Sequence, residues 1–315
     1  MKKNKGFILI SVLIICLIIM CLTLKITENL PDDNAMIRTI VEQKKAKFAF
    51  ISGINTAASI IINESKLTKC SDTYKSKWNI NNMKINFENN DFIIINCFDE
   101  NSKLPLNFLD VRVLKKIFSK AGIDKEKSLI CAESFLDWID PESVTKRFNG
   151  YENADYNRMG YKCKDYYIES FYELENVKGF EFLKKKNNNS KSFITILNQF
   201  STPYYEVKKI NINTASPEIL EILFEDTIGT DAVFFKEYRK KNIIFKNITD
   251  FVEIFGIAGR EYYEELIDVK SEFFNLEIFY TSSSKNQYIC NSLLQRTIEN
   301  GNFNFKIIKW KTKSL

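Results

Sequence analysis

Residues 7–24 read FILISVLIICLIIMCLTL, an apolar run of 18 residues without a charge, between the basic segment MKKNKG and Lys25. At ~1.5 Å per residue, a helix of this length spans roughly 27 Å, about one hydrocarbon core. The lysines before the run predict that the N-terminus stays in the cytoplasm and that the chain after the run lies outside. A cleavable secretory signal usually has a shorter apolar region and ends in a small-residue site, which the stretch from Met20 to Lys25 lacks. We therefore expect a membrane-spanning helix.

The junction between the basic leader and the apolar run carries a second signal. Gly6 ends the leader and Phe7 begins the run, an order that resembles the leader of type IV prepilins and pseudopilins. The resemblance implies that prepilin peptidase cuts between Gly6 and Phe7 on the cytoplasmic side and that Phe7 is then N-methylated. Most members of that class have Glu at the fifth mature position, where it pairs with the N-terminal amine of a neighbouring subunit. In this sequence the fifth mature position is Ser11.

Composition excludes several classes of function. The chain of 315 residues has no histidine, so Ser-His-Asp and Cys-His catalysis and His-based zinc sites are excluded. Seven cysteines include no C-x-x-C pair, so we expect any bound metal to be a hard cation held by oxygen. Of the net charge of +5, three units come from Lys2, Lys3 and Lys5 in the leader. The remainder is nearly neutral, a poor electrostatic match to a nucleic-acid backbone.

The exported part begins with a predicted helical stalk and ends in strands. From residue 26 to about 66 an apolar stripe recurs at helical spacing, and Pro31 predicts a kink or a restart. The stripe consists of Ile37, Ile40, Val41, Lys44, Phe48, Ile51 and Ile54. Alternating β-rich segments predict strands that share one sheet. These segments are 83–87, 91–96, 273–281, 287–296 and 303–311. The chain between about 100 and 270 is then a mainly helical insertion.

The insertion contains an internal repeat. Residues 106–118 resemble 212–224, each with an Asn, a capping region and then a helix that ends in an apolar pair. Residues 171–179 likewise resemble 248–256. In the second copy, Thr214 or Ser216 can cap a helix whose first turn holds Pro217. We therefore expect two related helical units, at about 100–180 and 205–268.

An ordered set of short motifs resembles one known family. After the leader without the fifth-position Glu, the order is Asp137-Trp138-Ile139-Asp140, Gly150-Tyr151-Glu152 with Tyr156, Tyr172-Glu173-Leu174 through Gly179, and Ile212-Asn213-Thr214-Ala215-Ser216-Pro217-Glu218. Together they resemble protein K of the type II secretion system, the GspK family of minor pseudopilins. The resemblance covers essentially the whole chain.

The resemblance implies an α/β (α+β) pilin-like fold, in which a long N-terminal helix packs on an antiparallel sheet. It carries a large insertion of two helix-hairpin-helix or SAM-like repeats. We divide the chain into a leader at 1–6, a membrane helix at 7–24, a stalk and first strands at 25–99, an insertion at 100–270 and final strands at 271–315. The implied protein is a non-enzymatic, single-pass inner-membrane subunit with a periplasmic C-terminal domain. Its implied partners are the minor pseudopilins I and J and the major pseudopilin.

Two features agree physically with a place at the tip of the periplasmic pseudopilus. A buried carboxylate in a fibre of stacked helices must find a cation or pay a large desolvation penalty. A subunit with no neighbour ahead meets no amine, so Ser11 in place of Glu is tolerated there. An insertion of about 170 residues also prevents another subunit from stacking above it. Both features favour capping over elongation.

A cluster of acidic residues predicts a metal site. Calcium takes 6–8 oxygen ligands from carboxylates, carbonyls and water, and the resemblance to GspK, where calcium-binding members are known, supports this ion. The candidate ligands are Asp137, Asp140, Glu142, Glu152 and Asp155. The alternative is a solvated acidic loop in which Asp137 or Asp140 caps a helix. Two carboxylates could also serve as the acid and base of a glycosidase, but the sequence indicates no substrate cleft.

The main rival function is binding of DNA. The segment Phe255-Gly256-Ile257-Ala258-Gly259-Arg260 has the pattern of a helix-hairpin-helix turn, and with residues 212–216 it also resembles membrane-anchored competence DNA receptors. Against this, the turn at 224–229 lacks the usual glycine pair. Glu225 and Asp226 would repel phosphate there. A packing role for this hairpin is our preferred interpretation, and we do not expect binding of nucleic acid.

The cysteines leave the disulfide pairing open. Cys16 and Cys21 lie in the membrane run and act as small apolar residues. Five further cysteines would face an oxidising periplasm, so at most two bridges form. The two possibilities are Cys131 with Cys163, which would close the acidic loop, and Cys70 with Cys97, which would tie the stalk to the sheet.

Overall fold

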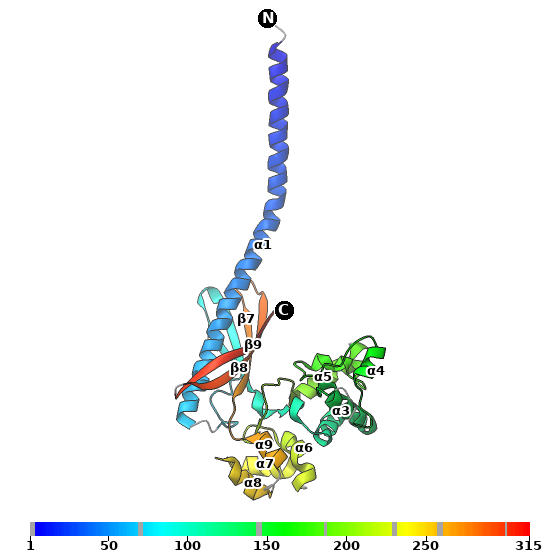
Figure 1. Ribbon diagram of the computed structural model, residues 1–315. Coiled ribbons are helices and arrows are strands. Elements are labelled where there is room, and N and C mark those ends of the chain that lie inside the picture. Colours follow the sequence, from blue (N-terminus) through cyan, green and yellow to red (C-terminus); the bar gives the residue numbers. More distant parts are fainter. Residues whose placement is uncertain are drawn as a thin grey trace.

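The computed structural model describes residues 4–68, 72–142, 147–185, 188–228, 232–256, 261–299 and 301–315. Its first element is one long helix, α1 (Asn4–Thr68), which continues through Pro31. A restart at Pro31 is therefore wrong: a proline removes one helical hydrogen bond, and the turns on either side keep theirs. Figure 1 shows that α1 bends between its straight N-terminal part and the part that lies on the sheet.

A five-stranded antiparallel sheet packs on the C-terminal part of α1, in the order β1-β2-β7-β8-β9. The strands are β1 (Met83–Asn86), β2 (Phe92–Asp99), β7 (Phe273–Thr281), β8 (Gln287–Glu299) and β9 (Asn302–Ser314). The expectation that the early and late strands share one sheet is confirmed. The turn between β1 and β2 places Asn89 and Asn90 at φ of 63° and 65°, which asparagine tolerates better than most residues.

The face of α1 that packs on the sheet is not the predicted stripe. Of that stripe only Ile54 is buried, whereas Ile37 and Phe48 are 57% and 72% exposed. The buried face is rich in small residues, which allow the helix and the sheet to approach closely. At Gly53 a Cβ atom would lie 3.0 Å from Ile278 Cδ1 and 3.1 Å from Ile93 Cδ1. The remaining buried apolar residues of this face are Ala46, Ala49, Phe50, Ala57, Ala58 and Ile61.

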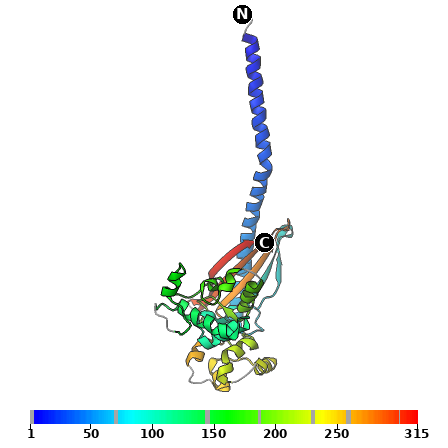
Figure 2. The same ribbon diagram turned by 90° about the vertical axis from the view of Figure 1, so that its right-hand side faces the viewer.

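The chain between β2 and β7 forms the insertion, which lies at the end of the molecule away from the N-terminus (Figure 1). Its helices are α2 (Val111–Lys120), α3 (Lys125–Ile139), α4 (Asn153–Arg158), α5 (Asn188–Phe200), α6 (Pro217–Ile228), α7 (Ala232–Lys240), α8 (Ile248–Phe255) and α9 (Glu261–Leu266). Short strands form two parallel pairs, β3 (Leu104–Pro105) with β4 (Ser201–Thr202) and β5 (Ile210–Asn211) with β6 (Ile267–Asp268). In the view of Figure 2, the helices of the insertion lie in front of the lower part of the sheet and below it.

The insertion has its own core, distinct from the core between α1 and the sheet. Five 3₁₀ helices complete the described chain, one between β1 and β2 and four along the insertion. They are η1 (Glu88–Asn90), η2 (Glu100–Ser102), η3 (Leu106–Phe108), η4 (Phe171–Asn176) and η5 (Glu181–Lys185).

The internal repeat is visible in the hydrogen bonds of two asparagines. The Asn107 side chain accepts from the Ile168 N–H at 2.9 Å and donates to the Ile168 carbonyl at 3.0 Å. The Asn213 side chain accepts from the Phe245 N–H at 2.9 Å and donates to the Phe245 carbonyl at 2.8 Å. Each asparagine thus pairs with the backbone of one residue, as a strand neighbour would. Ile168 and Phe245 each stand three residues before the second repeated segment. That segment is the 3₁₀ helix η4 in one copy and the α-helix α8 in the other.

A buried polar network joins α1, the sheet and the insertion. Arg296 of β8 forms an ion pair with Asp72 and donates to the Ser65 hydroxyl at the end of α1 and to the Ser271 carbonyl. The Ser271 hydroxyl in turn donates to Asp99, the last residue of β2, which also accepts from Thr214 of the second repeat. Thr214 is half-buried and the other groups are fully or nearly fully buried, so their partners fix how the three parts meet.

Candidate metal centre and membrane anchor

The acidic cluster begins on the last turn of α3. Asp137 is buried, and a Cβ atom at Gly150 would lie 1.6 Å from Asp137 Oδ2. Only glycine therefore allows the loop to pass this close to the carboxylate. Arg147 of the same loop forms an ion pair with Asp137 Oδ1. Asp137 Oδ2 is buried without a hydrogen-bond partner among the described residues.

Three further groups come together beside Asp137. One carboxylate oxygen of Glu152, one of Asp165 and the sulfur of Cys163 lie within 4.8 Å of one another. Asn153 holds this loop together, since its side chain accepts from the Cys163 N–H at 2.9 Å and donates to Asp165 Oδ2 at 3.0 Å. The Asp165 N–H donates to the Trp138 carbonyl at 3.1 Å, and Asp165 itself has a φ of 54°. The cluster is thus built by the chain folding back onto the end of α3.

The electrostatics of the cluster favour a proton or a cation. Burial, with the nearby charges of Asp137 and Asp165, raises the pKa of Glu152 to about 7. Burial also raises the pKa of Asp137, against the opposing effect of Arg147. Both oxygens of Glu152 and Asp165 Oδ1 are buried and accept no hydrogen bond from the described residues. An unpartnered buried carboxylate is costly, so these oxygens are suited to coordinate a positive charge.

The donor set fits calcium better than a soft metal. Glu152, Asp165 and Asp137 Oδ2 offer carboxylate oxygens, the ligands that calcium prefers. The Cys163 thiol lies 3.3 Å from the Trp138 carbonyl, to which it donates, and burial raises its pKa to about 12. Cys163 therefore stays a neutral thiol that packs beside the oxygens.

The structure changes the predicted ligand set. Glu142 is exposed and donates its N–H to Asp140 Oδ1 at 3.1 Å, where Asp140 ends α3. Asp155 accepts from the Glu152 N–H at 3.3 Å, so it acts as a cap of α4. Of the predicted ligands only Glu152 belongs to the cluster, and Asp137 is buried near it, where its charge acts on Glu152. Asp165 was not among the predicted ligands. Its signal was the C-x-D spacing from Cys163, a residue that we considered only as half of a disulfide.

Of the two disulfides considered from sequence, the structure does not contain Cys131–Cys163, and Cys70–Cys97 lies partly outside the described residues. Cys131, Cys163 and Cys97 are buried free thiols, and Cys70 lies outside the described residues. Cys131 faces the backbone at Gly179, where a Cβ atom would lie 2.7 Å from its sulfur. Cys163 faces the end of α3 instead, as its hydrogen bond to Trp138 shows. Cys97 lies inside the core between α1 and the sheet.

The apolar run at the N-terminus forms the free end of α1. Among the described residues, length and composition mark Met36–Lys66 as a candidate membrane span and Leu9–Lys25 as a shorter apolar helix. In the most apolar 18-residue stretch of Met36–Lys66, 44% is buried against the rest of the chain, so this part of α1 serves as the core helix of the head. In the N-terminal run, Phe7 and Leu9 are 75% and 65% exposed, which leaves this run as the segment suited to lipid.

Ser11 has its hydrogen-bonding needs met within α1. Its hydroxyl donates to the Phe7 carbonyl at 2.9 Å, four residues earlier. A serine in this position therefore requires no partner from a neighbouring molecule.

The region considered for DNA binding is only partly described. Gly256 ends α8 with a φ of 64°, and residues 257–260 lie outside the described residues. The segment predicted as the partner turn is helical up to Ile228, so that prediction is wrong for its described residues. Glu225 and Asp226 of α6 are 3.1 and 2.8 Å from Lys116 of α2. These acids thus join the two repeats through ion pairs.

Comparison with known proteins identifies the fold. No model of a protein family and no curated protein matches the sequence. A solved structure does match: a chain of the GspK-GspI-GspJ complex from the type 2 secretion system of enterotoxigenic Escherichia coli. The similarity has a TM-score of 0.68 at 17% sequence identity and covers 88% of this chain and 98% of that chain. The chain therefore has the α+β fold of this component of the complex, with a long N-terminal helix, an antiparallel sheet and a large helical insertion.

Proposed function

We propose that this protein is a minor pseudopilin of the type II secretion system, which caps and nucleates the tip of the periplasmic pseudopilus together with the minor pseudopilins I and J. The observation that carries this proposal is the fold, which matches nearly the whole length of a chain from the GspK-GspI-GspJ complex. The same architecture joins an exposed apolar helix to a folded head. The protein acts as a structural subunit, not as an enzyme.

The N-terminal helix supports a place at the tip. Ser11 donates to the Phe7 carbonyl and needs no charged partner. A Glu in its place would carry a charge into the membrane, and that charge would need the N-terminal amine of a subunit ahead. A subunit at the tip has no such neighbour. The helix of residues 7–24 anchors the precursor in the inner membrane, with its N-terminus in the cytoplasm and the head in the periplasm.

The stalk supplies a second contact surface. The predicted stripe stays exposed in its N-terminal half, where Ile37, Ile40 and Val41 lie away from the sheet. In the assembled tip this stripe packs on the stalk helices of the minor pseudopilins I and J. The major pseudopilin then enters below and pushes the tip outward.

The insertion supports capping. It occupies the end of the head away from the N-terminus (Figure 1), where a subunit ahead would have to stack. Calcium bound by Glu152, Asp165 and Asp137 holds the loop of the first repeat closed. The ion thereby supports the shape of the cap and takes part in no reaction.

The leader provides the test. We predict that Gly6→Ala leaves the precursor uncut by prepilin peptidase and abolishes type II secretion in a strain that depends on this protein. The reason is that the enzyme must fit a small, flexible residue before the scissile bond. Immunoblotting for the precursor and a secretion assay measure both effects, with Lys5→Arg as the matched control that keeps the leader charge.

Mass spectrometry of the mature N-terminus separates this function from its rivals. An N-methylated Phe7 supports a pseudopilin. An N-terminus elsewhere, or normal cleavage and secretion in the Gly6→Ala variant, would contradict the proposal. Retardation of duplex DNA by the purified protein at physiological salt would favour a DNA receptor instead.

A further inference from the structure

The strand β9 forms one edge of the sheet, and half of its backbone groups face outward. The Leu315 N–H donates to the Gln287 carbonyl at 3.0 Å, and Lys313 and Lys311 lie opposite Ile289 and Asn291 in the same register. Residues along an antiparallel pair alternate between those bonded to the partner strand and those directed away from it. The N–H and C=O groups of Trp310, Thr312 and Ser314 are therefore directed to the open edge. No described strand pairs with that edge.

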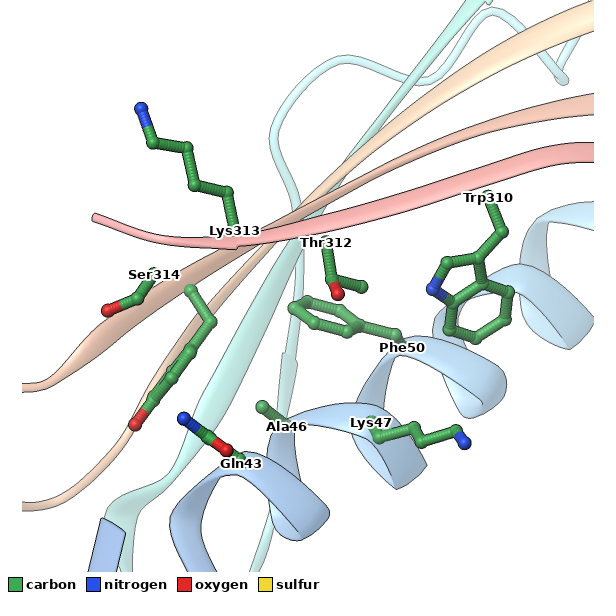
Figure 3. A pocket seen from close by; sticks show the side chains of 9 residues that line it. Gln43, Ala46, Lys47, Phe50, Trp310, Thr312, Lys313 and Ser314 are labelled. Carbon is green, nitrogen blue, oxygen red and sulfur yellow. The ribbon is translucent and has the colours of Figure 1, made fainter. Parts of the chain in front are cut away.

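A hollow lies beneath this edge, between β9 and α1. It has a volume of about 430 Å³, and aromatic and small side chains line much of it. Figure 3 shows Thr312 and Phe50 directed toward each other across the hollow, while Lys313 points to the opposite side of the strand. Two of the lining residues, Tyr288 and Ser314, also line a second hollow of about 300 Å³ next to it. The open edge thus has a cleft for side chains along its inner face.

The outer face of the same strand is basic. Lys311 and Lys313 are exposed, and Lys47 of α1 stands at the rim of the hollow. None of these three lysines forms an ion pair within the described part of the chain. Lys309, one step further along the face, lies 3.3 Å from Glu169 of the insertion. The positive charge at the open end of β9 is therefore available to a partner.

A second copy of this chain is a poor partner for the edge. If two β9 strands paired around Thr312, Lys311 of each would lie opposite Lys313 of the other. Like charges directly opposite one another destabilise a sheet. Lysines on an edge strand are a known means of preventing such self-pairing. The charges that oppose a copy of β9 attract a strand with acidic side chains.

We propose that the edge of β9 binds an extended segment of another protein, which adds to the sheet as a sixth strand. This segment alternates acidic side chains, opposite Lys311 and Lys313, with apolar side chains that enter the hollow beside Phe50 and Trp310. Its backbone pairs with the outward groups of Trp310, Thr312 and Ser314. This binding mode is strand addition, in which backbone bonds supply affinity and alternate side chains supply specificity. The inference does not depend on the proposed place in the pseudopilus.

The first test uses two synthetic peptides of about eight residues, long enough for one strand. One alternates glutamate with valine, and the other alternates lysine with valine. The full chain, in nanodiscs of zwitterionic phosphatidylcholine, is titrated against each labelled peptide, and binding is followed by fluorescence anisotropy. We expect the acidic peptide to bind at least about tenfold more tightly than the basic one, and its affinity to fall as salt is raised. No binding of the acidic peptide up to about 1 mM, or equal binding of both peptides, would overturn the proposal.

The second test separates backbone pairing from simple charge attraction. Thr312→Pro removes an N–H group that faces the open edge and leaves the bonds to β8 intact, a position where proline is tolerated. We expect Thr312→Pro to lower the affinity for the acidic peptide at least about tenfold. Thr312→Val keeps the N–H and should change this affinity less than about threefold. The double variant Lys311→Glu with Lys313→Glu should reverse the preference between the peptides. Thermal unfolding verifies that each variant is folded. If the folded Thr312→Pro protein binds like Thr312→Val, strand addition is wrong and the lysines merely protect the edge.

Discussion

At the scale of single residues, Glu152 is a carboxylate buried inside the insertion. Both of its oxygens are buried without a hydrogen bond among the described residues. Calcium should therefore stabilise the wild-type protein, by roughly 5 °C in the midpoint of thermal unfolding at about 100 times the dissociation constant. We predict that Glu152→Ala abolishes this shift. Differential scanning fluorimetry with calcium and with a chelator measures it.

The control for this prediction is Glu142→Ala. Glu142 is one of the acidic residues predicted as ligands, but in the structure it lies on the surface outside the cluster. The Glu142→Ala variant should keep the full calcium shift. If Glu142→Ala loses the calcium-dependent rise in the unfolding midpoint and Glu152→Ala keeps it, then Glu152 is not a calcium ligand.

Asp99 makes a pH-dependent contribution to stability. Burial, followed by the charge of Asp72, raises its pKa from 3.8 to about 7, although hydrogen bonds from Ser271 and Thr214 oppose the rise. The native state therefore holds the proton more tightly than the unfolded state. The contribution of protonated Asp99 to the free energy of unfolding is complete below about pH 4 and is lost as the pH rises through about 7. The slope of this loss is at most about 1.4 kcal/mol per pH unit.

We predict that Asp99→Asn, which resembles the protonated carboxyl, removes this part of the pH dependence. Urea unfolding of the wild type and the variant between about pH 5 and pH 8 should show a smaller loss of stability with rising pH in the variant. Parallel pH profiles of the two proteins would show that Asp99 does not titrate in this range.

At the scale of elements, the strands were easier to predict than the packing face of α1. The strands alternate apolar and polar residues, and this period of two directly indicates which residues face the helix. On α1 the visible pattern is the stripe of large apolar residues, yet small residues on another face make the contact with the sheet. The reason is that hydrophobicity alone does not measure how closely two elements approach. Phe48 remains exposed while Ala57 and Ala58 are buried.

Gly53 offers a direct test of this packing. A side chain there would meet Ile278 and Ile93 at about 3 Å. We predict that Gly53→Leu lowers the free energy of unfolding by about 1–3 kcal/mol through overpacking. Phe48→Leu, on the exposed face, should change it by less than about 0.5 kcal/mol. Urea denaturation compares the two variants, and equal stability would mean that α1 does not lie this close to the sheet.

The candidate site was only partly predictable for a similar reason. Glu152 of the cluster and the neighbouring Asp137 were predicted because they are acidic residues near a turn. Asp165 joins them only because the loop folds back over the end of α3, with its N–H bonded to Trp138. This tertiary contact spans many residues and leaves no periodic signal. The repeat, in contrast, was recognisable because Asn107 and Asn213 perform the same backbone pairing in both copies.

At the scale of the whole molecule, the buried network around Arg296 links the stalk, the sheet and the insertion. The ion-pair partner Asp72 is fully buried, so the loss of Arg296 would leave an uncompensated charge in the interior. We predict that Arg296→Met destabilises the head by about 3–5 kcal/mol in chemical denaturation. Adding Asp72→Asn should recover part of this loss, because the stranded charge is then removed. If the double variant is less stable than Arg296→Met alone, the network does not act as a charge pair.

The insertion enters and leaves the sheet at neighbouring points. Asp99, the last residue of β2, lies opposite Phe274 on β7, so about 170 residues begin and end on two paired strands. The insertion therefore takes the place of the turn that would join β2 and β7 as a β-hairpin. A short turn could join the two strands without altering the register of the sheet, and a different domain could be placed at the same point. Evolution can therefore exchange the insertion while it preserves α1 and the sheet.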